Sequence, residues 1–283
     1  MKKTLRLTAL VAVAAGLAFA SCQKEDNSSN SSSNSSSNSS GTPAPAGAET
    51  LTLTAADVDF TLVRVEPGTF RMGANEGDDQ AFDREKPAHE VTLTKPYYIA
   101  TTEVTQELYA AVTGSYPSSF TGEAGLPVEM VSYADAVAFC ARLSELTGRT
   151  VTLPTEAQWE YAARGGHMAP ATPTLYAGGD DLDAVAWYVG NSDRKTHPVA
   201  GKAANALGLY DMTGNVWEWC LDLYGAYTAD AVSDPQGPSE GSFRVIRGGC
   251  WGDPTQNCRL SFRIDYAPTS GTSDLGFRVV VLP

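Results

Sequence analysis

The side chains with the most obvious chemistry in this sequence are its cysteines. Beyond Cys22 the chain carries Cys140, Cys220, Cys250 and Cys258. An even number of cysteines is typical of disulfides in exported proteins, and thiolates are the ligands that Cu(I) prefers. We expect Cys140 to be a buried small side chain on an apolar helical stripe. For the others, a Cys250–Cys258 bond, a Cys220–Cys258 bond and fully reduced thiols all stay open.

Histidine-based chemistry has much less support. The three histidines, His89, His167 and His197, are far apart in the sequence, and no Ser-His-Asp order or phosphate-binding glycine loop stands out. We expect His197, in "KTHPV", to be a loop or core histidine.

The densest group of functional side chains is "GNVWEWC", residues 214–220. It places two tryptophans, a carboxylate and a cysteine within seven positions. A buried strand, a metal site and one wall of an active site are all compatible with this composition.

Two segments predict the helices that would support such a site. In "SYADAVAFCARLSELTG", Ser132 is the expected N-cap and Gly148 the stop. Residues at helical spacing form its apolar stripe: Ala136, Val137, Cys140, Leu143 and Leu146. In "PTEAQWEYAARGG", Thr155 and Gln158 form a capping-box pattern, and Gly165-Gly166 ends the helix. A shorter helix is expected within "TQELYAAVTG".

Strands are predicted to be short. "FTLVRVEPGTFRMG" alternates and turns at Pro67-Gly68 like a hairpin, and "FRVIRGG" and "LGFRVVVL" are later candidates. Because regular structure is sparse after Gly166, we expect rigidity to come from buried polar contacts, metal ions or disulfides.

The N-terminal region predicts export. Residues 1–21 join a basic start to an apolar run too short for a membrane span, which is typical of a secretory signal. Small residues directly before Cys22 resemble a bacterial lipoprotein processing site, with Cys22 as the lipidated residue. The following "QKED" resembles sorting signals of Bacteroidetes lipoproteins, so we expect a lipid anchor, most simply at the outer-membrane surface.

Composition then separates a tether from a folded part. Residues 22–50 are rich in Ser and Asn and lack large apolar side chains, which predicts a disordered tether. Residues 51–283 form one expected domain. The net charge of −13 argues against nucleic acid as a partner, and the membrane is expected to be reached only through the lipid.

Several motifs in order resemble the formylglycine-generating enzyme family, also called sulfatase-modifying factor domains. They are "FRMG", "EVT", "LPTEAQWEYAARGG", "GLYDMTGNVWEW", "RVIRGGCW", "NCRLSFR" and "LGFRVV". The resemblance implies an α+β fold related to C-type lectins, with few short helices and short antiparallel strands.

The resemblance also implies a calcium site. Carried over residue by residue, its ligands are Asp211, Gly214, Val216 and Glu218, with main-chain oxygens from the middle two. Carboxylates and carbonyls are the oxygen ligands that Ca²⁺ prefers. The alternative is that Glu218 caps backbone amides while Trp217 and Trp219 pack on opposite sides of a strand.

Copper is implied less clearly. The family's oxidases hold copper with two cysteines five residues apart and convert a sulfatase cysteine to formylglycine. Here Cys258 matches the second of these positions, but the first is Asp253, a hard ligand that suits Cu(I) poorly. Cys250 is the conceivable substitute.

A third resemblance points to binding rather than catalysis. The C-terminal frame "RGGCWGDPTQNCRLSFRIDYAPTSGTSDLGFR" is similar to that of surface lipoproteins diversified by retroelements. The resemblance implies a binding surface of Trp251, Asp253, Phe262, Ile264, Asp265 and Tyr266. With the "WEW" segment added, the predicted pocket residues are Trp217, Trp251, Asp253, Phe262 and Tyr266. The leading hypothesis is therefore a non-catalytic, calcium-stabilised lipoprotein that binds a protein or peptide ligand. The alternatives are an oxidase acting on sulfatases through Cys258 and Cys250, and a retroelement-diversified binder.

Overall fold

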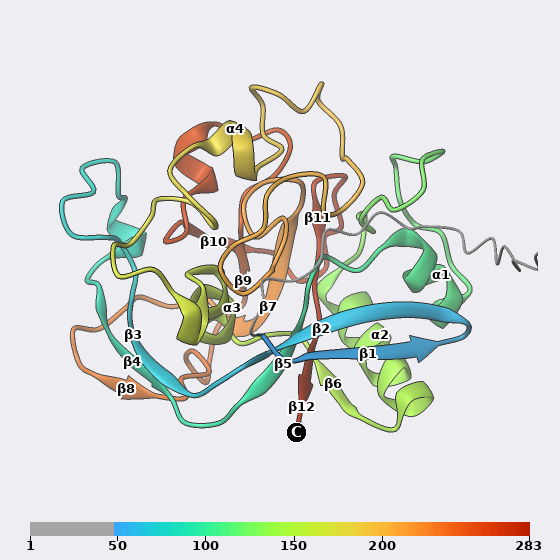
Figure 1. Ribbon diagram of the computed structural model, residues 1–283, viewed down its shortest axis with the longest axis horizontal. Helices are drawn as coiled ribbons and strands as arrows, with labels where there is room; N and C mark the ends of the chain where they lie inside the picture. The colour runs from blue at the N-terminus through green and yellow to red at the C-terminus, as the bar shows by residue number, and fades with distance from the viewer. Residues whose placement is uncertain (1–47) are drawn as a thin grey trace, which may run out of the picture. The chain divides into compact units, whose positions relative to one another are not determined.

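A computed structural model describes residues 48–283 (Figure 1). The predicted signal sequence, the lipidation residue Cys22 and nearly all of the predicted tether lie outside these residues. The first strand begins at Thr50, one residue before the expected start of the domain. Within residues 48–283, no helix is both long enough and apolar enough to cross a membrane.

The largest sheet has five strands in the order β1-β2-β5-β12-β6. Its last strand in sequence, β12, lies between β5 and β6 and pairs antiparallel with both. The strands are β1 (Thr50–Ala55), β2 (Val58–Val65), β5 (Tyr97–Ala100), β6 (Thr150–Thr152) and β12 (Val280–Leu282).

Two smaller sheets complete the described β-structure. One has the order β10-β9-β7-β11, and the other has the order β3-β4-β8. The β7–β11 and β4–β8 pairs are parallel, whereas the sequence predicted antiparallel strands only. The strands are β3 (Gly68–Met72), β4 (His89–Leu93), β7 (Trp217–Leu223), β8 (Val232–Ser233), β9 (Arg244–Arg247), β10 (Arg263–Tyr266) and β11 (Leu275–Gly276).

The predicted hairpin at Pro67-Gly68 is wrong. Strands β2 and β3 flank this turn but belong to different sheets. Both edges of β2 are already hydrogen-bonded, to β1 and β5, so β3 pairs with β4 instead. The turn therefore carries the chain from one sheet to the next.

The predicted helices are confirmed at their caps. Helix α2 (Tyr133–Thr147) begins after Ser132, whose hydroxyl accepts a hydrogen bond from the Asp135 amide, and ends at a left-handed Gly148. Helix α3 (Glu156–Ala163) carries the expected Thr155–Gln158 capping box. The remaining helices are α1 (Gln106–Thr113), α4 (Leu182–Val185) and the 3-10 turns Asp83–Glu85, Gly166–Met168 and Thr255–Cys258.

The predicted stripe of α2 is only partly correct. Ala136, Cys140 and Leu143 are buried, but Val137 and Leu146 are 40% and 46% exposed. Phe139 is fully buried, and its ring stacks on Tyr109 of α1 at 5.3 Å. The packing partner, rather than the spacing alone, selects the inward face.

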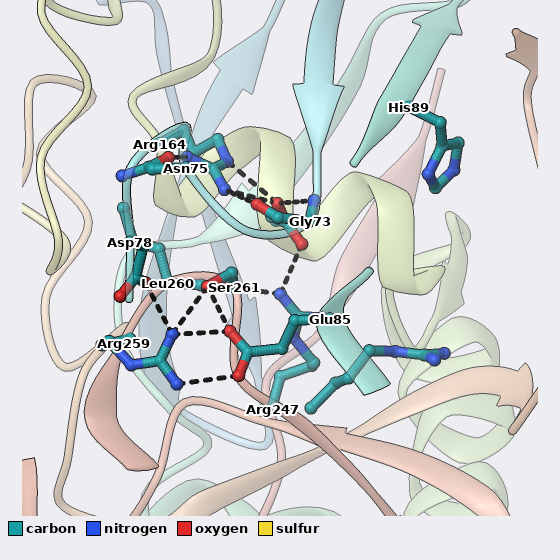
Figure 2. A network of polar contacts seen from close by, with 12 residues as sticks. Gly73, Asn75, Asp78, Glu85, His89, Arg164, Arg247, Arg259, Leu260 and Ser261 are labelled. Carbon is teal, nitrogen blue, oxygen red and sulfur yellow. Dashed lines mark hydrogen bonds and ion pairs between the residues drawn. The ribbon is translucent and has the colours of Figure 1, made fainter. Parts of the chain in front are cut away.

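Buried arginines supply much of the rigidity that the loops require. Each of the four is at most 2% exposed and pairs with a carboxylate: Arg247, Arg259, Arg263 and Arg278. Figure 2 shows one example, in which Arg259 donates to both oxygens of Glu85 at 2.7 Å. Ser261 adds a hydrogen bond to Glu85 at 2.6 Å. These bonds fix the loop that leads into β10.

Candidate functional site

A hollow of about 170 Å³ opens beside the four-stranded sheet. Four of the five predicted pocket residues line it: Trp217, Asp253, Phe262 and Tyr266. The other lining residues come from the same sheet and its adjoining loops: Ile246, Asn257, Ile264, Thr272, Asp274 and Leu275. None of the three histidines is among them.

The fifth predicted residue, Trp251, does not line the hollow. Its indole nitrogen donates to the Ser273 carbonyl at 3.0 Å, and its ring meets Phe120 edge-on at 5.5 Å. The neighbouring Asp274 carbonyl accepts a hydrogen bond from the Trp217 amide at 2.8 Å. Trp251 thus helps to hold the Ser273–Asp274 segment, which supplies a wall of the pocket.

Asp253 organises the loop between the two candidate copper cysteines. Its carboxylate accepts hydrogen bonds from the Cys250 amide at 3.0 Å and from the Asn257 side chain at 2.7 Å. The two ends of this loop lie close together, since a Cβ on Gly249 would be 3.1 Å from the Cys258 sulfur. Asp253 therefore acts as a structural centre of this loop.

The two thiols are poorly prepared for metal ligation. Cys250 packs in the main core, while Cys258 packs in a separate small cluster beside Tyr176. Burial raises the pKa of both thiols, and the charge of Asp253 raises both further. Since Cu(I) binds the thiolate, this environment opposes the form that a copper site needs.

All four cysteines after Cys22 are unpaired and buried. Cys140 is 3% exposed within the packed face of α2, and burial raises its pKa to about 12. Cys220, fully buried on β7, also has a raised pKa because of its burial. Of the three alternatives left open by the sequence, the structure shows the fully reduced one, and neither the Cys250–Cys258 nor the Cys220–Cys258 bond is formed.

The region of the predicted calcium ligands contains unpaired buried oxygen atoms. Asp211 is 2% exposed, and its Oδ2 accepts a hydrogen bond from the Ala200 amide at 2.7 Å, but its Oδ1 has no partner. Glu103, 1% exposed, likewise has one unpaired oxygen, Oε1. Leaving two buried carboxylate oxygens without partners is costly, so this site fits a cation.

The electrostatics of these side chains agree with that fit. Burial raises the pKa of Asp211 to about 6, and burial followed by the charge of Asp211 raises the pKa of Glu103 well above its usual range. Arg278 opposes both shifts, but it is ion-paired to Glu218. Three carboxylates thus share one arginine.

Glu218 does not cap backbone amides, contrary to the alternative considered from the sequence. It accepts hydrogen bonds from the Trp159 indole at 2.7 Å and from Arg278 at 2.6 and 2.7 Å. Trp217 and Trp219 pack in the same core cluster rather than on opposite sides of a strand, because residues two apart share a face.

Main-chain atoms would have to complete a metal shell. Within residues 48–283, no three His, Cys, Asp or Glu side chains are grouped so as to hold a metal ion. Gly214, at φ +79°, allows the close approach that this turn requires, since a Cβ there would lie 2.2 Å from the Trp187 carbonyl oxygen. The carbonyls of Gly214 and Val216 stay predicted ligands, as the resemblance to the family implies.

The model for the "Sulfatase-modifying factor enzyme 1-like domain" matches residues 56–282. The chain belongs to this family. The α+β fold related to C-type lectins, predicted from the motifs, is therefore confirmed, with sparse helices and short strands.

Its relatives within the sulfatase-modifying factor family carry different names. The chain is 32% identical to "Chaperone protein LppX" of Paenibacillus barcinonensis, over 77% of this chain and 88% of that protein. It is 31% identical to the formylglycine-generating enzyme of Streptomyces coelicolor, over 76% and 87%. The structure of "Treponema denticola variable protein 1" matches with a TM-score of 0.75 and 33% identity, over 83% and 99%.

Two site residues of this sulfatase-modifying factor domain were not predicted from its sequence. Glu103 lies in the "EVT" motif, which was noted but given no role, and Asp274 directly precedes "LGFR". Both are far in sequence from the residues that they approach, Asp211 and Cys250. Only their acidic character within recognised motifs could have drawn attention to them.

Proposed function

We propose that this protein is a non-catalytic ligand-binding or assembly module, stabilised by calcium and carried as a lipoprotein on the cell surface. The observation that carries the proposal is Asp253. It stands where the oxidases have their first copper cysteine, and its carboxylate accepts hydrogen bonds from the Cys250 amide and the Asn257 side chain within the loop. Burial, followed by the charge of Asp253, raises the pKa of the Cys258 thiol.

The pocket beside Asp253 is suited to holding a ligand. Trp217, Phe262 and Tyr266 provide aromatic surface, and aromatic side chains contribute large contact areas at low entropic cost. Similarity to a variable protein and to a chaperone supports a role in binding or assembly. The lipoprotein assignment rests on the sequence preceding and including Cys22.

Calcium would be held by oxygen atoms alone. The unpaired oxygens of Glu103 and Asp211, together with Glu218 and the carbonyls of Gly214 and Val216, are the candidate ligands. A bound divalent cation would neutralise the excess of buried negative charge. It would also order the turn between the 187–200 loop and β7.

The deciding experiment is an anaerobic titration of the reduced full-length chain with Cu(I) against a competing chelator. We expect no tight one-to-one site, and no change in Cys258→Ser or Cys250→Ser relative to the matched control Cys140→Ser. Tight binding that Cys258→Ser abolishes, followed by copper-dependent conversion of a cysteine peptide to an aldehyde with O₂, would overturn the proposal.

One observation favours an oxidase as the second candidate. Cys258 stands at the second copper position, and the chain aligns with 87% of a formylglycine-generating enzyme. In that case Cys250 would have to replace the missing ligand and the substrate would be a sulfatase cysteine.

A diversified surface binder is a special case of the leading proposal, favoured by the likeness to variable protein 1. A neighbouring reverse-transcriptase gene and a near-duplicate of the 3′ coding segment would identify it.

A further inference from the structure

The pocket beside β7 is lined by two acidic side chains, while the guanidinium groups of Arg84 and Arg259 lie outside its lining, 6.0 Å from the Phe262 ring. Asp253 and Asp274 both line it, and no lining residue is basic. Within residues 48–283 neither carboxylate forms an ion pair. The Asp274 Oδ2 accepts a long hydrogen bond from the Cys250 thiol, at 3.8 Å. By contrast, the buried glutamates Glu85, Glu156 and Glu160 all pair with arginines.

Three aromatic side chains also line the hollow. Trp217 and Phe262 lie with their ring centroids 5.9 Å apart, and Tyr266 lines the same hollow. The faces of aromatic rings attract cations, most strongly where water is excluded. Rings and carboxylates therefore favour the same class of ligand.

Trp217 also brings a polar donor, its indole N–H, to the lining of the pocket. Trp217 is 5% exposed, and its indole nitrogen is not one of the buried side-chain atoms that lack a partner within residues 48–283. The Trp159, Trp219 and Trp251 indoles all donate to named acceptors. A ligand that also offers a carbonyl oxygen, such as a peptide, would accept a hydrogen bond from this donor.

The size of the hollow restricts what can enter. Its volume of about 170 Å³ is below the roughly 300–1,000 Å³ of pockets that enclose drug-sized ligands. A single side chain suits it better. The wall is held in advance by the Trp217 amide and the Trp251 indole, so little ordering would be required on binding.

We propose that this pocket receives an arginine or lysine side chain from a peptide or protein partner, an inference that rests on the proposed binding function. The charged group approaches Asp253 and Asp274, the stem lies against Phe262 and Tyr266, and a backbone carbonyl accepts from Trp217. Arginine should bind more tightly than lysine, because a guanidinium stacks on aromatic faces. The net charge of −13 would draw basic partners toward the surface.

The test uses the full-length chain labelled with ¹⁵N, in which the five tryptophans give separate indole N–H signals. The probes are the peptides Ac-Gly-Arg-Gly-NH₂ and Ac-Gly-citrulline-Gly-NH₂, which differ in charge at nearly equal shape. We expect the arginine probe to shift the Trp217 signal in a saturable way. Citrulline should bind at least about tenfold more weakly, since it cannot pair with the carboxylates.

Asp274→Asn removes one charge without disturbing the hydrogen bonds of Asp253, so it should weaken arginine binding by about tenfold. Asp265→Asn is the matched control, because Asp265 is an exposed residue on β10 that does not line the pocket. Equal binding of arginine and citrulline would overturn the cation inference and leave the binding function intact. A Trp217 signal unmoved by either probe would also overturn it. The copper titration tests the non-catalytic proposal separately.

Discussion

Two networks of buried charge meet at Trp159, and they are balanced very differently. The ring of Trp159 lies 5.2 Å from the Arg247 guanidinium, which belongs to the network of Glu156 and Glu160. Its indole N–H donates to Glu218, which belongs to the network of Glu103 and Asp211. The first network matches its carboxylates with arginines; the second has Arg278 alone.

The difference appears in the pKa values of the acidic side chains. Burial would raise the pKa of Glu156, but Arg263 and Arg247 outweigh burial and hold it at about 2. Burial raises that of Asp211 to about 6, and the nearby Arg278 does not compensate. The first network is therefore complete with protein atoms, whereas the second leaves one oxygen each of Glu103 and Asp211 without a partner among residues 48–283.

The largest effect should come from breaking the balanced network. Arg247→Met would leave Glu160 paired only with Arg164 and would remove one of the arginine partners of Glu156. We expect a loss of about 3–5 kcal/mol in the free energy of unfolding, the usual cost of stranding a buried charge. Denaturant unfolding measures it, with the exposed Arg149→Met as the control. A change below about 1 kcal/mol would contradict the assigned role of Arg247.

Calcium should stabilise the unbalanced network. At a concentration about 100 times the Kd, the metal adds about 3 kcal/mol to the free energy of unfolding, and a chelator removes it. Thermal unfolding with Ca²⁺, Mg²⁺ and chelator checks this, and Mg²⁺ should do less because it demands a smaller, stricter shell.

Glu103→Gln tests the same comparison, because its effect on the free energy of unfolding should change sign when metal is bound. Without metal, removal of a carboxylate that repels Asp211 should raise stability; with Ca²⁺, loss of a ligand should reduce the gain. If the variant is destabilised without metal and calcium changes neither protein, no cation belongs in this site.

An intermediate effect is expected from pH. Asp222 accepts a hydrogen bond from the Glu156 amide at the start of α3, and burial followed by the charge of Glu156 raises its pKa to about 7. A raised acid pKa contributes stability that is present below about pH 4 and is lost as pH rises through about 7. Asp222→Asn should therefore flatten the decline of stability between pH 4 and 8, on the order of 2 kcal/mol. Unfolding across that range that is identical in both proteins would refute this.

The smallest effect should come from Tyr227→Phe. The tyrosine hydroxyl donates to Glu156 at 3.1 Å, but Arg247 and Arg263 also bind this carboxylate. Because the acid keeps these partners, we expect a loss of only about 1 kcal/mol. Tyr116→Phe, at an 80% exposed position, is the control. A loss as large as that of Arg247→Met would mean that the network is less redundant than its geometry indicates.

Local sequence rules predicted the helices well and the sheets less well. The caps at Ser132 and Thr155 act within a few residues, so the sequence contains their whole explanation. The hairpin at Pro67-Gly68 was wrong because the partners of β2 are set by strands distant in the chain. The outward-facing Val137 and Leu146 depend in the same way on what packs against α2.

In the candidate site, too, local motifs predicted some residues, whereas residues joined only by tertiary contacts were not predicted. Motif positions identified Trp217, Asp253, Phe262 and Tyr266, which the fold brings into one pocket. Spacing could not identify Glu103 as a neighbour of Asp211, because tertiary contacts alone bring them together. Nor could it reveal that Trp251 braces the wall instead of facing the pocket.

The position of β12 has a consequence for the order in which the protein can be made. Because Val280–Leu282 bridge β5 and β6, two strands synthesised much earlier stay without their shared neighbour until these residues leave the ribosome. A chain interrupted before Val280 would expose strand edges open to pairing with other chains. The β1–β2–β5 pairs can form earlier, but β6 can join this sheet only after translation has reached β12.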